Sequence, residues 1–344
     1  MGTALSTVRI GLIGLGDRGR TALRLLQECS GAEVTVLCDL CADNLHAARE
    51  FLAKSGKRPV LCTDGLQAYR VACQSADVDL VYICSDWNSH TTIAIEALNN
   101  GKHVAVEVPA ATTIKDIQSL VAAVQATDRQ CLLLENVCFE QQVIDAISAI
   151  RNGEIGEVVH AEGSYYHCLG DRWAPWRLNI NRQSRGDLYP THELGPICQA
   201  LDIGNTDRLE TLVCMDSASL TGSRVYEDVL HTPAPDFQNG DHTTTLIRTT
   251  RGRTILLKHD VLTEQPYERQ LTFIGTRGRI TLNDTGKTSH ELMSLNMNRR
   301  LIESLTKGMP FGISIHDLAS WCAVIPLSRL SIQQGFMPVP FPKF

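Results

Sequence analysis

A glycine-rich turn near the N-terminus constrains the fold of this chain more than any other feature. Residues 14–19 have the sequence Gly-Leu-Gly-Asp-Arg-Gly, directly after the apolar run Val8–Ile13 and at the start of a helical pattern. In such a strand–turn–helix unit, Gly14 permits a tight turn, Gly16 lets the backbone approach a pyrophosphate, and Gly19 lets helix and strand pack closely. The context therefore predicts a dinucleotide-binding turn rather than an unliganded glycine loop, with the helix N-terminus facing the phosphates.

The first 139 residues alternate short apolar runs with amphipathic helical patterns, which is typical of a parallel, doubly wound sheet. Strands joined through single helices need right-handed crossovers, and these leave the strands parallel. We expect residues 1–139 to form an N-terminal Rossmann domain. Its expected strands are Val8–Ile13, Glu33–Cys38, Pro59–Cys62, Val78–Cys84, His103–Val106 and Cys131–Leu134, and its expected helices are Arg18–Glu28, Asp43–Lys54, Thr91–Asn99 and Ile114–Ala126.

From residue 140 the pattern changes to longer alternating runs separated by turns. We therefore predict an α/β protein whose second domain, residues 140–344, is an α+β domain with a large, mostly antiparallel sheet. A linking helix, Gln142–Arg151, opens this domain, and a last helix, Ser314–Ile332, is placed to fold back on the first domain. An open sheet face favours a homo-oligomer, most simply a dimer. The expected strands are Val158–Tyr166, Leu209–Met215, Thr243–Thr249, Thr254–Val261, Gln270–Ile274 and Arg279–Leu282.

Charge and composition exclude several classes of partner. The 344 residues carry a net charge of −6, whereas nucleic acids and anionic membranes require a basic face. No apolar run is long enough to cross a bilayer, and the N-terminus has no signal-peptide pattern. Most of the twelve cysteines lie in apolar patterns, as buried free thiols do, which favours a cytoplasmic protein. A leader that has already been removed, and hence a periplasmic location, stays open.

The chain has one CxxC, at residues 38–41, and it lies at the end of the second predicted strand. No second pair completes a metal site, so we expect no bound metal. Asp39, inside this motif, lies twenty residues after Gly19. A carboxylate at this place accepts hydrogen bonds from the ribose hydroxyls and repels a 2′-phosphate. The predicted cofactor is therefore NAD rather than NADP, because Arg18, within the phosphate turn, is badly placed to reverse that preference.

Two further strand ends are expected at the same crevice of the sheet. Residues 85–90, Ser-Asp-Trp-Asn-Ser-His, follow the fourth strand, and residues 107–109, Glu-Val-Pro, follow the fifth. In fold order and in these motifs the chain resembles the sugar and inositol dehydrogenases of the Gfo/Idh/MocA type. These enzymes usually have Glu-Lys-Pro in the second motif, with the lysine beside the reacting hydroxyl. Val108 replaces that lysine and cannot transfer a proton, so the usual dehydrogenase base is missing.

A more specific resemblance comes from residues 185–196, Arg-Gly-Asp-Leu-Tyr-Pro-Thr-His-Glu-Leu-Gly-Pro. They resemble the Asn-Leu-Tyr-Pro-Thr-His-x-Leu-Gly-Pro segment of glycoside hydrolase family 109, whose known activity is on α-linked N-acetylgalactosamine. Glu193 stands where glycine is common in that family, and the region Cys168–Trp176 is trimmed. Further matches follow in the same order at Glu107–Ala110, Leu134–Asn136, Pro266-Tyr267, Ala319–Trp321 and Ile325–Ser328.

The family resemblance implies two sets of site residues. NAD would be held by Gly14, Gly16, Asp17, Arg18, Gly19, Asp39, Trp87, Asn88, His90, Glu107, Val108 and Asn136. A small-molecule or glycan substrate would be bound by Tyr165, Arg177, Tyr189, Pro190, Thr191, His192 and Tyr267. Of these, His192 and Tyr189 would transfer protons, and we expect His192 in a loop.

Several of these side chains also fit a structural role. Arg177 can pair with Asp171 or Asp187, and Trp173 and Trp176 fit packing as well as sugar stacking. The remaining histidines of this region lack a supporting motif, so structural or surface positions are expected for His160, His167 and His231.

The chemistry implied by the family is redox-neutral glycoside hydrolysis. The sugar loses a hydride from C3 to NAD⁺, the resulting ketone acidifies C2, and loss of the C2 proton expels the C1 substituent. Water then adds, and the hydride returns to C3; NAD-dependent families of this kind are exceptions to the usual pair of carboxylates. Two alternatives remain. A plain NAD-dependent sugar or cyclitol dehydrogenase fits the fold but not Val108, and a non-enzymatic sugar sensor does not need the retained Tyr189 and His192.

Overall fold

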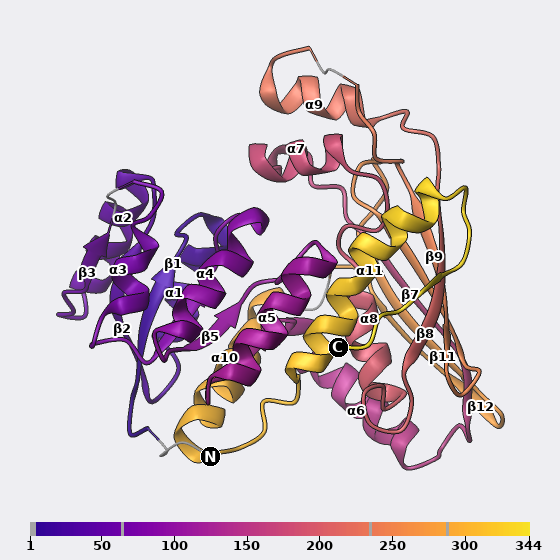
Figure 1. Cartoon of the computed structure of the whole chain (residues 1–344), viewed down its shortest axis with the longest axis horizontal. Coiled ribbons are helices and arrows are strands. Elements are labelled where there is room, and N and C mark those ends of the chain that lie inside the picture. The colour runs from indigo at the N-terminus through magenta and orange to yellow at the C-terminus, as the bar shows by residue number, and fades with distance from the viewer. Residues whose placement is uncertain (1–4, 63–64, 234–235, 287–288) are drawn as a thin grey trace. The chain divides into compact units, whose positions relative to one another are not determined.

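The computed structural model describes residues 5–62, 65–233, 236–286 and 289–344. The chain divides into two compact units, Met1–Phe139 with His290–Ala319, and Glu140–Ser289 with Ser320–Phe344 (Figure 1). The partition into domains 1–139 and 140–344 stays a prediction; by its contacts, His290–Ala319 groups with the N-terminal unit. Among the described helices, none is long and apolar enough to cross a membrane.

The first unit is built on a six-stranded parallel sheet, which confirms the predicted doubly wound fold. The strand order is β3-β2-β1-β4-β5-β6, so the order reverses between β1 and β4. Sheets of this kind bind ligands at the carboxyl ends of the strands beside such a reversal. The strands are β1 Val8–Ile13, β2 Ala32–Cys38, β3 Val60–Cys62, β4 Leu80–Ile83, β5 His103–Val106 and β6 Cys131–Leu133.

Helices cover this sheet, and the central strands are accordingly apolar throughout. All four residues of β4 are buried, as expected for a parallel strand that is covered on both faces. The helices are α1 Asp17–Leu26, α2 Ala42–Ala53, α3 Tyr69–Gln74, α4 Trp87–Asn99 and α5 Ile114–Ala126, with a 3₁₀ turn η1 at Asn136–Phe139. Helix α10, His290–Lys307, joins them and packs on α1 and η1.

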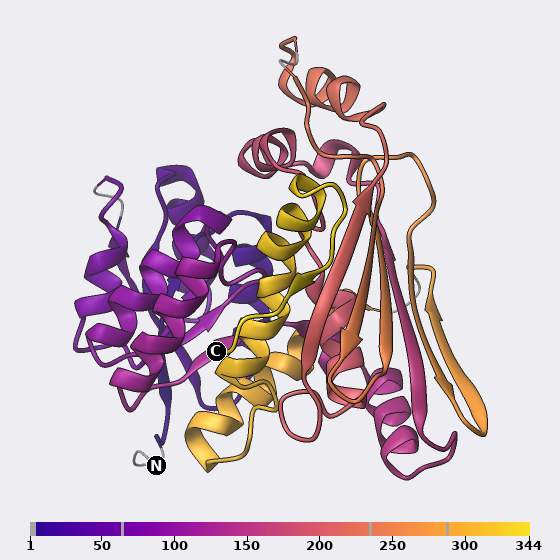
Figure 2. The same cartoon turned by 45° about the vertical axis from the view of Figure 1, so that its right-hand side comes forward.

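The second unit contains a seven-stranded, mostly antiparallel sheet, as predicted (Figure 2). Its order is β12-β11-β7-β10-β9-β8-β13, and β7 and β10 form a parallel pair. Helix α8, Thr191–Ala200, packs on one face, against β7, β10 and β11. The strands are β7 Val158–Tyr166, β8 Leu209–Asp216, β9 Thr243–Thr249, β10 Thr254–Asp260, β11 Glu268–Gly275, β12 Gly278–Asp284 and β13 Val339–Pro340.

The helices of the second unit differ most from the prediction. Helix α6, Gln141–Arg151, and helix α11, Ile315–Gln333, were expected, but α7, Pro175–Gln183, α8 and α9, Gly222–Leu230, were not. The expectation that His192 lies in a loop is wrong, because α8 begins at Thr191. Helix α8 contains Gly195 and Pro196, which weaken a helical pattern, and packing on the sheet stabilises it.

Candidate active site

The glycine turn of the first unit has the geometry that a bound pyrophosphate requires. Gly14 has a φ of +86°, and a Cβ there would lie 2.6 Å from the Cys84 carbonyl. A Cβ on Gly19 would lie 1.9 Å from the Gly14 oxygen, so both positions need glycine. A Cβ on Gly16 would meet no atom within 4 Å, and no side chain caps α1 there. The open backbone at this helix N-terminus fits the phosphates of a dinucleotide.

Asp39 connects the end of β2 to this turn. Its Oδ2 accepts a 2.5 Å hydrogen bond from Leu15 N, and its Oδ1 accepts one of 2.7 Å from Cys41 N. The side chain is half-buried, so the lone pairs that remain can accept the ribose hydroxyls of NAD.

The Arg18 guanidinium is bound by other side chains of the protein, so it is poorly placed to pair with a 2′-phosphate. Its Nε donates to Glu107 Oε1 at 2.6 Å, and its Nη1 donates to Ser294 Oγ at 3.1 Å. Asn136 Nδ2 donates to the same Ser294 oxygen at 3.0 Å. Two predicted cofactor residues, Arg18 and Asn136, thus converge on Ser294 of α10. Sequence reasoning missed Ser294 because α10 was not predicted.

His90 connects the two strand-end turns of this unit. Its ring nitrogens lie 2.9 Å from the carbonyl oxygens of Pro109 and Ser85, and burial lowers its pKa. Both ring nitrogens are therefore used in contacts with the backbone. Trp87 and Val108, which belong to the same two turns, are buried. Asn88 is exposed, and its backbone N–H donates to Asp86, the N-cap of α4.

The second unit brings the predicted sugar-binding residues into one aromatic cluster. The Tyr165 ring is edge-on to His192 at 5.2 Å between centroids and edge-on to Tyr267 at 6.1 Å. Tyr189 is edge-on to His192 at 4.9 Å. The Arg177 guanidinium lies 4.7 Å from the centre of the Tyr189 ring, a cation–π geometry. Of the two carboxylates expected to pair with Arg177, Asp187 forms no ion pair with it among the described residues, and the Asp171 side chain lies outside the described part of the chain.

Two histidines that were assigned no role belong to this cluster. His167 Nδ1 is 2.7 Å from Tyr165 Oη, and its ring is edge-on to Tyr267 at 5.2 Å. His259 stacks on Tyr165 at 6.1 Å, and burial with nearby positive groups lowers its pKa to about 3. His167 was expected in a structural or surface position, and its hydrogen bond to Tyr165 places it beside the predicted sugar-binding residues.

Pro190 and Thr191 start helix α8. Pro190 is its N-cap, and Thr191 is 1% exposed. The Thr191 hydroxyl has no hydrogen-bond partner within the described part of the chain. Buried hydroxyls are normally satisfied, so a hydroxyl in this position suits a bound polar ligand.

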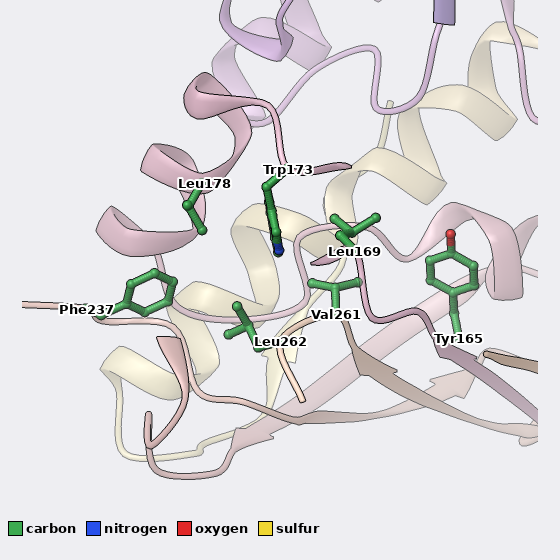
Figure 3. Packing of buried hydrophobic residues seen from close by; sticks show 7 residues of the cluster. All are labelled: Tyr165, Leu169, Trp173, Leu178, Phe237, Val261 and Leu262. Atoms are coloured by element: carbon green, nitrogen blue, oxygen red, sulfur yellow. The ribbon is translucent and has the colours of Figure 1, made fainter. Parts of the chain in front are cut away.

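An apolar cluster supports the aromatic residues (Figure 3). Trp173 is 4% exposed and packs with Leu178, Val261 and Leu262, while Tyr165 lies at the edge of the cluster. Of the two interpretations for Trp173, this position supports packing. Tyr189 and Tyr267 pack against the same cluster and remain partly exposed.

A cavity of about 420 Å³ lies at the opposite end of the same sheet, beside Val158 and Thr276. It is lined by four arginines, Arg151, Arg251, Arg253 and Arg277. The side chains of three of them, all except Arg251, donate to backbone carbonyls within the described part of the chain. These three arginines therefore satisfy carbonyl groups at helix ends and turns. The predicted site residues do not line this cavity.

The comparisons with known proteins agree with both units. Residues 8–134 match the oxidoreductase family with an NAD-binding Rossmann fold. Residues 170–285 and 279–344 match the C-terminal domain of glycosyl hydrolase 109. Among solved structures, a probable dehydrogenase from Thermotoga maritima has a TM-score of 0.80 at 19% identity, covering 97% of this chain and 99% of its own. The myo-inositol dehydrogenase of Lactobacillus casei, crystallised with NAD(H) and myo-inositol, has a TM-score of 0.76 at 18% identity, covering 98% of each chain.

The fold and the glycine turn thus define an NAD-binding protein with an oxidoreductase fold. Glycosyl hydrolase family 109 protein 1 of Phocaeicola vulgatus is 36% identical over 99% of this chain and 84% of its own length. The family 109 protein of Porphyromonas gingivalis is 35% identical over 99% of this chain and 85% of its own. The chain belongs to glycosyl hydrolase family 109 and is a glycosidase of that family.

Proposed function

We propose that this glycosidase hydrolyses glycosides of N-acetylgalactosamine or a related sugar by a redox-neutral route through C3. The observation that carries the proposal is the aromatic cluster of Tyr165, Tyr189 and His192, whose rings lie within 6.0 Å of one another. Phenols and an imidazole supply proton transfer and hydrogen bonds to sugar hydroxyls. The redox-neutral route does not require a pair of catalytic carboxylates in this cluster.

NAD, when bound at the glycine turn, supplies the acceptor for the C3 hydride and returns the hydride at the end of the cycle. Gly16 and the N-terminus of α1 would hold the pyrophosphate, and Asp39 would bind the ribose. Arg18 and Glu107, paired at 2.6 Å, keep the turn in place.

Protons move at three positions of the sugar in this reaction. The C3 hydroxyl loses its proton as C3 loses a hydride, and C2 loses its proton to a base beside the new ketone. The oxygen that leaves C1 gains a proton. We assign the first two transfers to His192 and Tyr189 between them, while Arg177 holds Tyr189 by its contact at 4.7 Å.

A plain sugar or cyclitol dehydrogenase is the second candidate. The likeness to the inositol dehydrogenase of L. casei favours it at the level of the fold alone. The side chain at position 108 opposes it, because Val108 is 4% exposed and cannot transfer a proton.

A panel of 4-nitrophenyl glycosides, assayed without added oxidant or reductant, separates the two candidates. The proposal predicts release of nitrophenol without net NADH, whereas a dehydrogenase accumulates absorbance from NADH and leaves the glycosidic bond intact. His192→Ala should lower kcat at least about 100-fold while NAD stays bound, as expected for a lost acid–base group. The matched control is His160→Ala, a histidine on β7 that bonds Thr254 Oγ1 at 2.7 Å. Equal activity of both variants would contradict the role of His192.

A further inference from the structure

We propose that Arg172 and His167 position Tyr165 as the proton donor to the oxygen that leaves C1. This inference rests on the hydrolytic reaction proposed above. It adds a catalytic role for Tyr165, so far assigned only to sugar binding, and a positioning role for two residues that the sequence analysis did not place in the site.

The three side chains form a hydrogen-bonded chain. Tyr165 Oη lies 2.7 Å from His167 Nδ1, and Arg172 Nη2 lies 2.9 Å from His167 Nε2. The backbone N–H of His167 donates to Asp260 O at 2.9 Å, which fixes the residue just beyond β7. The chain runs from exposed Arg172 to Tyr165, which is 7% exposed.

The direction of these hydrogen bonds follows from the donors available. A guanidinium has only donors and keeps its charge, so Arg172 donates to His167 Nε2. A neutral imidazole then carries its single proton on Nδ1 and donates it to Tyr165 Oη. Because the phenol oxygen accepts this bond, the Tyr165 proton is not used by His167 and is free for a ligand.

The surroundings keep His167 neutral and Tyr165 protonated. Burial, together with the nearby charges of Arg172 and Arg177 and the neighbouring His192, lowers the pKa of His167 to about 4. Burial raises the pKa of Tyr165 well above its usual value. The other titratable groups that face this pair are Tyr189, Tyr267, His259 and the buried carboxylate of Glu193.

A protonated phenol with a fixed donor behind it suits a general acid. The Tyr165 O–H bond breaks as its proton passes to the C1 substituent, and the C1–O bond breaks with its electron pair on that oxygen. The phenolate that forms accepts the hydrogen bond from His167 Nδ1–H, which stabilises the charge. It recovers a proton from the water whose oxygen adds to C1, so Tyr165 ends the cycle as it began.

Nitrogen NMR of the histidine-labelled, full-length holoprotein tests the positioning directly. The His167 signals, identified by their loss in His167→Asn, should show the Nδ1–H tautomer from pH 6 to pH 8. Arg172→Leu should introduce the Nε2–H tautomer, and Arg172→Lys, which keeps a donor, should restore the original one. An Nε2–H tautomer in the wild type would overturn the inference whether or not the protein hydrolyses glycosides.

The dependence on the leaving group tests the chemical role. Arg172→Leu should lower kcat about 10-fold or more for a methyl glycoside and at most about 3-fold for the 4-nitrophenyl glycoside of the same sugar, because a good leaving group needs little acid catalysis. KM should change little. The control is Arg224→Leu, which removes an exposed arginine paired with Glu264 at 2.8 Å on α9.

Equal losses for the two substrates would refute Tyr165 as the acid, even with the Nδ1–H tautomer present. A wild-type protein that hydrolyses neither substrate would refute the proposed function and the acid role together. In that case the NMR measurement still decides whether Arg172 sets the tautomer of His167.

Discussion

The ionisation of a single residue can differ from what the surrounding motif predicts. Asp187 is the clearest example, because the matching segment of the family has asparagine at this position. Its side chain is 1% exposed, and its Oδ2 has no hydrogen-bond partner among the residues described. Burial raises its pKa to about 7. A carboxyl group that keeps its proton below about pH 7 thus takes the place of an amide, and its Oδ1 accepts a hydrogen bond from Tyr189 N at 3.3 Å.

This pKa predicts how stability changes with pH. The folded-state pKa of Asp187 is raised above the unfolded value of about 3.9, so the folded state holds the proton more tightly. The free energy of unfolding should fall as the pH rises from about 4 to about 7, by at most about 4 kcal/mol, and then level off. Asp187→Asn should flatten this dependence and stabilise the protein at pH 8. Urea unfolding at pH 5 and pH 8 measures both, and parallel curves for the two proteins would contradict the assignment.

We predict that Asp39 decides which dinucleotide is bound. Removing its carboxylate loses hydrogen bonds to the ribose hydroxyls and the repulsion of a 2′-phosphate. Asp39→Ala should weaken NAD at least about 10-fold, the value of one charged hydrogen bond, and should narrow the preference over NADP. Calorimetry with both dinucleotides measures this. The matched control is Asp43→Ala, an aspartate in the first turn of α2. A wild-type protein that prefers NADP would refute the assignment.

At the scale of elements, the strands were predictable and several helices were not. The predicted bounds of β1 and β5 coincide with those in the structure, because short apolar runs between turns leave few alternatives. Helix α8 depends on contacts with β7 that no local pattern contains: a Cβ on Gly163 would lie 2.5 Å from the Glu193 Cβ. The position of His192 on α8 therefore could not be predicted from its neighbours in the sequence.

In the candidate site, too, some features could be predicted from local sequence and others depend on tertiary contacts. The contact between the glycine turn and Asp39 was predictable, because the two have fixed spacing along the chain. The aromatic residues were named through a family motif. Their partners His167, Arg172 and Ser294 were missed, because each becomes relevant only through a tertiary contact.

The turn between β1 and α1 allows a paired test of binding and folding. Gly16→Ala places its Cβ where no protein atom lies within 4 Å, so stability should be unchanged while NAD binding falls at least about 10-fold through the clash with the pyrophosphate. Gly19→Ala meets the Gly14 oxygen and should lower the free energy of unfolding by about 1–3 kcal/mol. Thermal unfolding and NAD titration measure the two effects. Unchanged NAD affinity in Gly16→Ala would place the cofactor elsewhere.

At the scale of the whole molecule, the face of the second sheet that α8 leaves uncovered is the predicted dimer surface. Leu246 lies in the middle of this face, in register with Leu256 and Val213 on its two neighbouring strands. Leu246 is 47% exposed and Met215 is 55% exposed. Contiguous apolar surface of this kind favours association.

Sedimentation at micromolar concentration tests this surface. The wild type should sediment at twice 37.9 kDa, and Leu246→Arg should sediment as the monomer with little loss of stability, because the side chain is half-exposed in the monomer. Leu220→Arg is the control, since Leu220 is 82% exposed outside the sheet. A wild-type monomer would contradict the prediction.

We propose that this glycosidase cleaves its substrate through oxidation at C3 and loss of the C2 proton, with His192 and Tyr189 moving protons in the second unit. Hydrolysis in heavy water, followed by mass and NMR analysis of the released sugar, tests this mechanism. We expect deuterium at C2 of the product, because the proton removed there exchanges with solvent before it returns. A sugar released by a demonstrably active preparation with no deuterium at C2 would rule the mechanism out.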